Sequence, residues 1–167
     1  MTIELILTTM QQLQKMHESL LQLAVEKGEY LKEGDIEAID ELIKKEQSHI
    51  AAIAQLERNR LLAVEQYFST QGQRLPRTAT ISDVIVSAGE QEKVALTEAK
   101  NRLLHTIHDL KWQNDLNQKL TYQSLQFVNL SLDMVRPRPE TANYSKNEVQ
   151  GQSPGAKPKL SSFDSQA

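Results

Sequence analysis

Histidine and carboxylate side chains are the residues of this chain that could most readily do chemistry, since together they can hold a metal ion or move protons. The 167 residues contain four histidines, His17, His49, His105 and His108. His105 and His108 are three residues apart and would share one face of a helix, but two imidazoles need further ligands to hold zinc. Because the chain has no cysteine, thiolate ligands and disulfides are excluded. We therefore predict that all four histidines are surface or boundary residues.

The segment Glu46-Gln47-Ser48-His49 has the Glu-x-x-His spacing of di-iron helical bundles. Such sites need two copies of the motif and two more inward-facing glutamates, and this sequence offers one copy. It also has no glycine-rich phosphate loop and no nucleophile motif. The sequence therefore predicts a protein that is not an enzyme and has no metal or cofactor, unless partners assemble a site.

Composition narrows the classes of partner and compartment. The net charge is −3 with 25% charged residues, so the chain lacks the basic face that nucleic-acid binding requires. Glu4 and several glutamines interrupt the N-terminal segment where a signal peptide would need a longer apolar run. No window approaches the roughly 18 apolar residues of a membrane span. We expect a soluble cytoplasmic protein without membrane insertion.

The elements that position these side chains follow from hydrophobic periodicity. Apolar residues recur at three- and four-residue steps, which predicts helices at about residues 2–33, 36–69, 81–88 and 90–135. The break at Gly34 and Asp35 supplies a C′ glycine and an N-cap. The predicted core stripe of the first helix is Ile3, Ile6, Met10, Leu13, Leu20 and Ala24. That of the second helix is Ile36, Ile39, Ile43, Ile50, Ile53 and Val64.

The third segment is short and has mixed signals. Thr80 is a good N-cap and Asp83 would lie in the first turn, which favours a helix. The run Val84–Ile85–Val86 has some strand character, because β-branched residues favour strands. The helical interpretation is the better supported of the two.

Residues 136–167 differ in composition from the rest. They hold four of the five prolines, many serines, five basic residues and three acidic ones, so their net charge is +2 and the rest of the chain carries about −5. Their few apolar residues lack a helical or strand period, so they cannot bury enough surface to offset the entropy of ordering. We predict a helical domain over 1–135 and a flexible Pro/Ser/Gly-rich tail, disordered over 136–167.

These elements predict an all-α fold: an elongated antiparallel helical hairpin or coiled-coil bundle of three long helices plus one short helix. At about 1.5 Å per residue, the last helix spans about 69 Å and the second about 50 Å. If these two helices lie antiparallel with their near ends level, the last one overhangs by about a dozen residues. The overhang would then be at about 124–135.

The end of the last helix, "NDLNQKLTYQSLQFVNLSLDMVRP", carries two apolar stripes, although a helix of a small soluble protein needs one. The first stripe starts at Trp112 and continues through Leu116, Leu120, Phe127, Leu130 and Met134. The second is Leu125, Val128, Leu132 and Val135, with Tyr122 at its flank. The second lines up roughly with the apolar side between Leu96 and Leu110. A drift of about 20° per heptad leaves open which stripe packs in the bundle and which is spare.

Three partners could cover the spare stripe: a second copy of the chain in a four-helix dimer or coiled coil, the short helix 81–88 folded back, or another protein. Asn114 and Asn117 lie on or beside the apolar seam. They are either a polar step that fixes the register of the helices or an anchor for a partner's backbone. Trp112 fits a buried core position and an interface anchor equally well.

The stretch from Asn114 to Pro137, followed by a tyrosine in "ANYSKN" and a C-terminus "LSSFDSQA", resembles the FlgN family of flagellar export chaperones. The order of the helices, the "EGD" break and the chain length are also similar to that family. The likeness is most specific from Asn117 to Tyr144.

The resemblance implies a substrate-specific chaperone for the hook–filament junction proteins FlgK and FlgL. It would bind their C-terminal helical segments in the cytoplasm, prevent premature assembly and deliver them to the flagellar type III export gate. The client-binding residues would then be Trp112, Leu116, Leu120, Leu125, Phe127, Val128, Leu130, Leu132, Met134 and Val135. Tyr144 matches the family tyrosine associated with docking to the cytoplasmic domain of the export gate. The alternatives are a self-associating structural coiled coil, and a chaperone for another flagellar client such as the filament cap or filament subunit.

Overall fold

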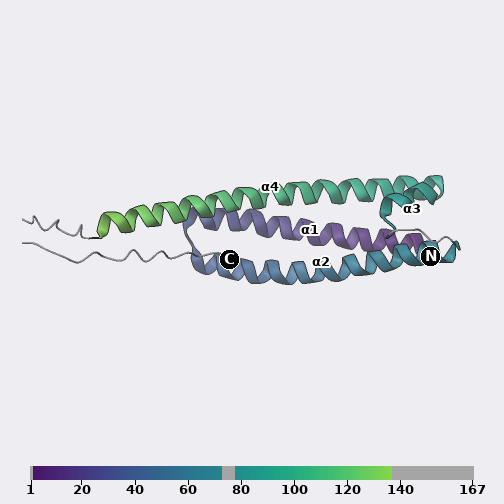
Figure 1. Ribbon diagram of the computed structural model, residues 1–167, viewed down its shortest axis with the longest axis horizontal. Coiled ribbons are helices and arrows are strands. Elements are labelled where there is room, and N and C mark those ends of the chain that lie inside the picture. The colour runs from purple at the N-terminus through teal and green to yellow at the C-terminus, as the bar shows by residue number, and fades with distance from the viewer. Residues whose placement is uncertain (1, 73–77, 137–167) are drawn as a thin grey trace, which may run out of the picture.

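A computed structural model describes residues 2–72 and 78–136, and it shows four helices in those ranges with no strand (Figure 1). The helices are α1 (Thr2–Glu33), α2 (Ile36–Thr70), α3 (Ile81–Ser87) and α4 (Glu90–Val135). The all-α prediction with three long helices and one short one is confirmed. The predicted disordered tail lies outside the described residues, except for Arg136.

The helix boundaries follow the local chemistry of the sequence. Gly34 has φ 75°, the left-handed conformation that glycine adopts readily, and it ends α1 by donating from its N–H to the carbonyl of Tyr30. Asp35 then caps α2, because its side chain accepts a hydrogen bond of 3.0 Å from the N–H of Ala38. These two residues therefore make the predicted hairpin between α1 and α2.

The short segment is helical, as predicted. Thr80 and Asp83 form a capping box in which the Thr80 N–H donates to the Asp83 carboxylate at 2.8 Å and the Thr80 hydroxyl accepts from the Asp83 N–H. Ile81 and Val84 are buried on the inner side of this helix. Tertiary burial together with the cap therefore outweighs the strand preference of the β-branched run.

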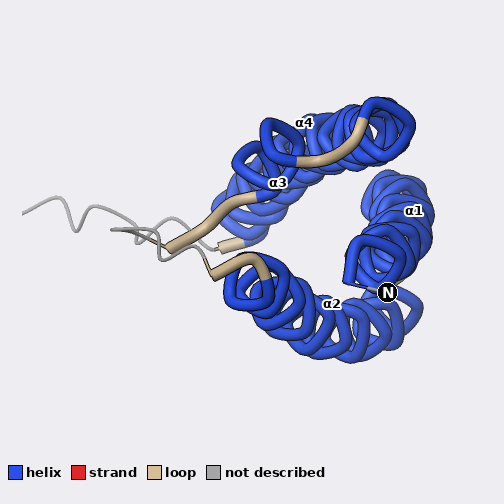
Figure 2. Tube along the Cα trace, turned by 90° about the vertical axis from the view of Figure 1, so that its right-hand side faces the viewer, coloured by secondary structure: helices blue, strands red, loops and turns tan. Residues whose placement is uncertain are grey.

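The other two long helices, α2 and α4, pack against α1 (Figure 2). α1 packs along α2 on one side and along α4 on the other, while α2 and α4 do not pack against one another. The Gln14 side-chain amide donates to the Thr106 hydroxyl at 2.8 Å, and Asn117 donates to the carbonyl of Ala24. Since both pairs increase together along the chain, α1 and α4 run parallel and α2 is antiparallel to both.

This arrangement corrects the supposition that the last helix lies against the second. The hydrogen-bonded pairs between α1 and α4 are offset by 92 and 93 residues. The end of α1 at Glu33 is therefore level with about residue 125 of α4. The overhang is confirmed at nearly the predicted place, but it extends beyond α1 and the α1–α2 turn, and not simply beyond the end of a paired α2 (Figure 1).

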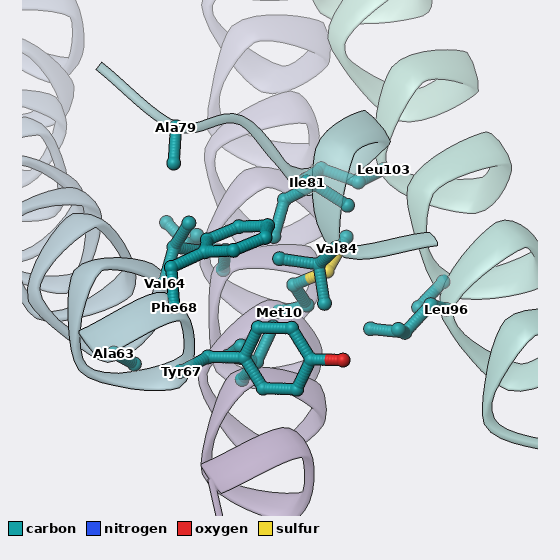
Figure 3. Close-up of a cluster of buried hydrophobic side chains, with 13 residues drawn as sticks. Met10, Ala63, Val64, Tyr67, Phe68, Ala79, Ile81, Val84, Leu96 and Leu103 are labelled. Atoms are coloured by element: carbon teal, nitrogen blue, oxygen red, sulfur yellow. The ribbon is translucent and has the colours of Figure 1, made fainter. Parts of the chain in front are cut away.

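The main core lies at the end of the bundle where α3 is found (Figure 3). Tyr67 and Phe68 of α2 pack edge to face, with ring centroids 5.2 Å apart. Val84 of α3 lies between this aromatic pair and Leu96 of α4. Farther along the bundle the buried cluster shrinks to Leu20, Ala24 and Leu110. The core therefore tapers toward the end from which α4 projects.

Two sequence expectations fail here for reasons of packing. The short helix does not fold back over the last helix's apolar stripes, because Ile81 and Val84 bind it to the opposite end of the bundle. His17 is buried, and its Nδ1 lies 2.8 Å from the carbonyl oxygen of Leu13. The prediction that all four histidines lie at the surface or boundary is therefore wrong for His17.

Candidate functional site

The projecting end of α4 is a regular helix because its sequence contains no helix-breaking residue before Pro137. No glycine or proline occurs between residues 90 and 135. The helix ends at Val135, and Arg136 is extended with ψ 125°. Pro137 follows Arg136 in the sequence, and a proline disfavours the helical conformation of the residue that precedes it. The helix therefore carries its apolar side chains well past the end of α1.

Every residue from 121 to 130 is exposed, including the apolar ones. Phe127 is 71% exposed and Met134 is 87% exposed. Of the ten side chains predicted to bind a client, Leu116 and Leu120 are half-buried. The other eight are exposed: Trp112, Leu125, Phe127, Val128, Leu130, Leu132, Met134 and Val135. The structure thus leaves both stripes uncovered, and it rules out a core position for Trp112 within the described chain.

The two stripes relate differently to the bundle. At 100° per residue, the second stripe (Leu125, Val128, Leu132 and Val135) continues the line of Leu96, Leu103 and Leu110, which are buried against the rest of the fold. The first stripe (Trp112, Leu116, Leu120, Phe127, Leu130 and Met134) lies on the other side of the helix, about 100–180° around the helix axis from that line, and only its members Leu116 and Leu120 are half-buried. By direction around the helix, the second stripe therefore continues the line of that seam, whereas the last half-buried apolar residues before the overhang, Leu116 and Leu120, belong to the first stripe.

Asn117 fixes the register at this point. It is buried, its side-chain nitrogen donates to the carbonyl of Ala24 at 2.6 Å, and its side-chain oxygen accepts from Gln113 at 3.0 Å. Gly28 of α1 leaves room for this amide, since a Cβ at Gly28 would lie 2.8 Å from its oxygen. The register interpretation therefore holds for Asn117, whereas Asn114 is exposed on the adjacent face.

A cleft of about 620 Å³ lies beside this contact, between α2 and α4 with α1 as its floor. Its α2 wall consists of Ile36, Ile39, Ile43 and Ile50. We predicted these isoleucines as core, yet Ile36 is 74% and Ile50 is 56% exposed, and Ile43 is exposed as well. The prediction fails because α4 packs on α1 and leaves this part of the α2 stripe without a neighbour.

No signal in the α2 sequence marks the isoleucines as uncovered, because their spacing is that of an ordinary core stripe. The sequence feature that could have indicated their exposure lies in α1. A central helix must pack on two neighbours, and the small residues Ala24 and Gly28 allow α4 to approach α1 closely. That competition for α1 leaves α2 and α4 apart.

The floor and opposite wall of the cleft are polar in part. Lys27 of α1 pairs with Glu46 of α2 at 2.7 Å, and both side chains are largely buried. The α4 wall has Asn114, Asp115 and Gln118. Near Ile43, a hydrogen bond to Asp40 and the negative charges of Asp40 and Glu41 raise the pKa of Lys44. The cleft is therefore amphipathic, with an apolar wall from α2 and a hydrogen-bonding wall from α4.

In the ranges 2–72 and 78–136, no three histidine, cysteine or carboxylate side chains lie close enough together to hold a metal ion. His105 and His108 both face Asp109, with Nδ1 atoms 2.9 and 3.6 Å from its carboxylate oxygens. Both histidines are exposed and Asp109 is half-exposed. These are polar contacts between solvated side chains on a helix surface, and they do not form a group of three ligands that could hold a metal ion.

Comparison with known protein families shows to which family this chain belongs. The model of the family described as "FlgN protein" matches residues 1–150 of this chain. The chain belongs to the FlgN family. This is a family of flagellar export chaperones, so the resemblance noted in the sequence is confirmed.

One relative is 32% identical over 167 residues, covering the whole of both chains; it is the "Uncharacterized protein YvyG" of Bacillus subtilis (strain 168). No solved structure matches this FlgN-family chain. Among the described helices, none is long and apolar enough to cross a membrane. Tyr144, the predicted docking residue for the export gate, lies outside the described residues.

Membership of the FlgN family implies binding to flagellar hook-associated proteins in general. The structure adds a surface with suitable properties for that role. Both apolar stripes of α4 and the isoleucine wall of α2 are accessible on the same half of the molecule. These are the surfaces that a helical partner could cover.

Proposed function

We propose that this protein is a cytoplasmic chaperone that holds the C-terminal helical segments of the junction proteins FlgK and FlgL. It prevents their premature assembly and delivers them to the flagellar type III export gate. The observation that carries the proposal is the exposure of the apolar side chains between Leu125 and Val135 on a helix that extends past the end of α1. Membership of the FlgN family supplies the class of client.

The mechanism is recognition of an amphipathic helix by an apolar surface. A client segment that assembles through its apolar face would be protected while that face lies on the α4 overhang. Fully burying one large apolar side chain contributes about 1.5–3 kcal/mol, and the overhang offers seven that are exposed. Ordering of the client segment offsets part of this gain. Micromolar to nanomolar affinity, with reversible release, is therefore expected.

Delivery needs a second contact, with the export gate. By family resemblance, this contact uses Tyr144, which follows the client-binding helix in the sequence. Separate residues for client and gate would allow both to be bound at once. Tyr144→Ala should therefore abolish binding to the cytoplasmic domain of the gate without changing the affinity for the client.

Titration calorimetry with a C-terminal peptide of the cognate FlgK or FlgL tests the client site. We expect Phe127→Asp combined with Leu132→Asp to weaken binding at least tenfold, because each carboxylate would be desolvated in the complex. Leu62→Asp combined with Val94→Asp is the matched control, since both residues are exposed apolar positions away from the overhang. Full affinity of the overhang variant would place the site elsewhere.

The exposed stripes also favour a second candidate, a self-associating coiled coil. It predicts a stable dimer at low micromolar concentration in which the overhangs pair, and analytical ultracentrifugation measures this directly. A different flagellar client, such as the filament cap or filament subunit, is distinguished by competitive pull-down against FlgK and FlgL peptides.

A further inference from the structure

The cleft between α2 and α4 has the form of an incomplete four-helix bundle. α1 lies in the corner between two helices that both pack on it and do not pack against one another (Figure 2). The floor includes Leu20 and Leu31 of α1, and one wall carries Ile39, Ile43 and Ile50 of α2. An apolar wall of this length is normally covered by another helix in a globular protein.

At the opposite end of the molecule, a helix of this chain fills the equivalent space. Ile81 and Val84 of α3 are buried against the aromatic pair of α2 and against Leu96 of α4 (Figure 3). α3 contacts both α2 and α4, and so bridges the two helices that do not pack directly against one another. The groove between α2 and α4 therefore accepts a helix as its fourth member, and α3 occupies only its first turns.

The open part of the groove is continuous with the overhang. On α4, the cleft residues Asn114, Gln118 and Thr121 are followed at steps of four and three residues by Leu125 and Val128. All five therefore lie on one side of the helix, by the 100° rotation per residue. Ile36 stands at the start of α2, level with the end of α1, where the overhang begins. A helix lying on the second stripe would thus run directly into the cleft.

We propose that the cleft between α2 and α4 receives an amphipathic helix of the client, which continues from the second α4 stripe and completes a four-helix bundle with α1, α2 and α4. This inference rests on the proposed chaperone function and adds a second binding surface, on α2, to the overhang. In this proposal, the isoleucines of α2 are client-binding residues.

The two walls define the chemistry of the occupant. Its apolar side faces Ile39, Ile43 and Ile50, and its flank faces the polar side chains of α4. Asp115 forms no ion pair within the described residues, so a lysine or arginine of the client is the complement there. From the level of Ile50 to Val135 the continuous surface is about 36 Å long, which corresponds to a client helix of about 24 residues.

Affinity measurements test the role of α2. The probe is a C-terminal peptide of the cognate FlgK, about 24 residues long or longer. We expect Ile43→Asp combined with Ile50→Asp to raise its Kd at least tenfold, whereas Leu62→Asp, on α2 but outside the cleft, changes it less than twofold. Ile43 and Ile50 are exposed, so both variants should fold, and circular dichroism checks this.

Thiol protection provides a second readout that does not depend on a disruptive change. Since the chain has no cysteine, Ile43→Cys introduces a single thiol into the cleft and Leu62→Cys a single thiol outside it. We expect saturating peptide to slow alkylation of the thiol at position 43 at least tenfold. The thiol at position 62 should react at the same rate with and without peptide.

The outcomes separate this inference from the proposed function. If the peptide binds through the overhang while the cleft variant retains full affinity and the thiol at position 43 stays reactive, the cleft is not a client site and the chaperone function stands. If wild-type protein binds neither FlgK nor FlgL peptide, the proposed function fails and this inference fails with it. If the thiol becomes protected at higher protein concentration without peptide, a second copy occupies the cleft and the inference is overturned.

Discussion

The side-chain amide of Asn117 donates a hydrogen bond of 2.6 Å to the backbone carbonyl of Ala24, and this contact marks the place where α4 leaves the bundle. Asn117 is the last buried residue of α4. Beyond it, α4 has half-buried Leu120 and then an uninterrupted exposed segment from residue 121 to 130. A polar pair therefore sets the register of two parallel helices next to the surface that binds the client in our proposal.

Loss of this hydrogen bond should destabilise the fold. Asn117→Ala removes the side-chain N–H that donates to the buried carbonyl of Ala24, and it leaves space beside Gly28. We therefore expect the free energy of unfolding to fall by about 1–2 kcal/mol. Urea denaturation followed by circular dichroism measures the change. Asn114→Ala is the matched control, because Asn114 is exposed one turn earlier and should change stability by less than about 0.5 kcal/mol. Equal stability of both variants would contradict the register role of Asn117.

The same contact predicts an unusual response at Gly28. Replacing a helical glycine with alanine normally stabilises a helix by about 1 kcal/mol. Here the new Cβ would lie 2.8 Å from the Asn117 oxygen and 3.1 Å from the Gln113 nitrogen. We therefore expect Gly28→Ala to destabilise the wild-type protein and to stabilise the Asn117→Ala variant. A double-mutant cycle by urea denaturation checks this reversal, and the same sign in both backgrounds would refute it.

Much of this fold could be predicted from the sequence, because the local signals agree with the global structure. The α1 stripe through Ile6, Met10 and Leu13 is buried as its period indicated. The predicted N-caps at Asp35 and Thr80 both form. Local rules of this kind need only a few neighbouring residues, so they transfer directly from sequence to structure.

The pairing of the long helices could not be predicted from local sequence rules. Ile36, Ile43 and Ile50 have the spacing of a core stripe, and whether they are covered depends on how α1 is shared between two long neighbours. The burial of His17, by contrast, could have been predicted, because His17 lies on the α1 stripe, four residues after Leu13 and three before Leu20. The exposed stripes of α4 were found because a second stripe on one helix is visible in the sequence itself.

The α4 overhang should contribute almost nothing to stability. Its apolar residues beyond the end of α1 are all exposed, so they bury little apolar surface on folding. We expect chains of residues 1–136 and 1–124 to differ by less than about 1 kcal/mol in free energy of unfolding, while the shorter chain loses client binding. Comparing two truncated chains removes any effect of the tail. A far less stable 1–124 chain would show that the overhang packs on the rest of the molecule.

Trp112 should report on the state of the first stripe. It is the only tryptophan in the sequence and is 63% exposed. We expect the free protein to show the emission of a solvated indole that acrylamide quenches efficiently. If the client covers the first stripe as far as Trp112, saturating peptide should shift the emission to shorter wavelength and at least halve the quenching constant. Val94→Asp, away from both stripes, should leave this response unchanged. Shielded tryptophan in the free protein, increasing with protein concentration, would instead indicate that a second copy covers the stripe.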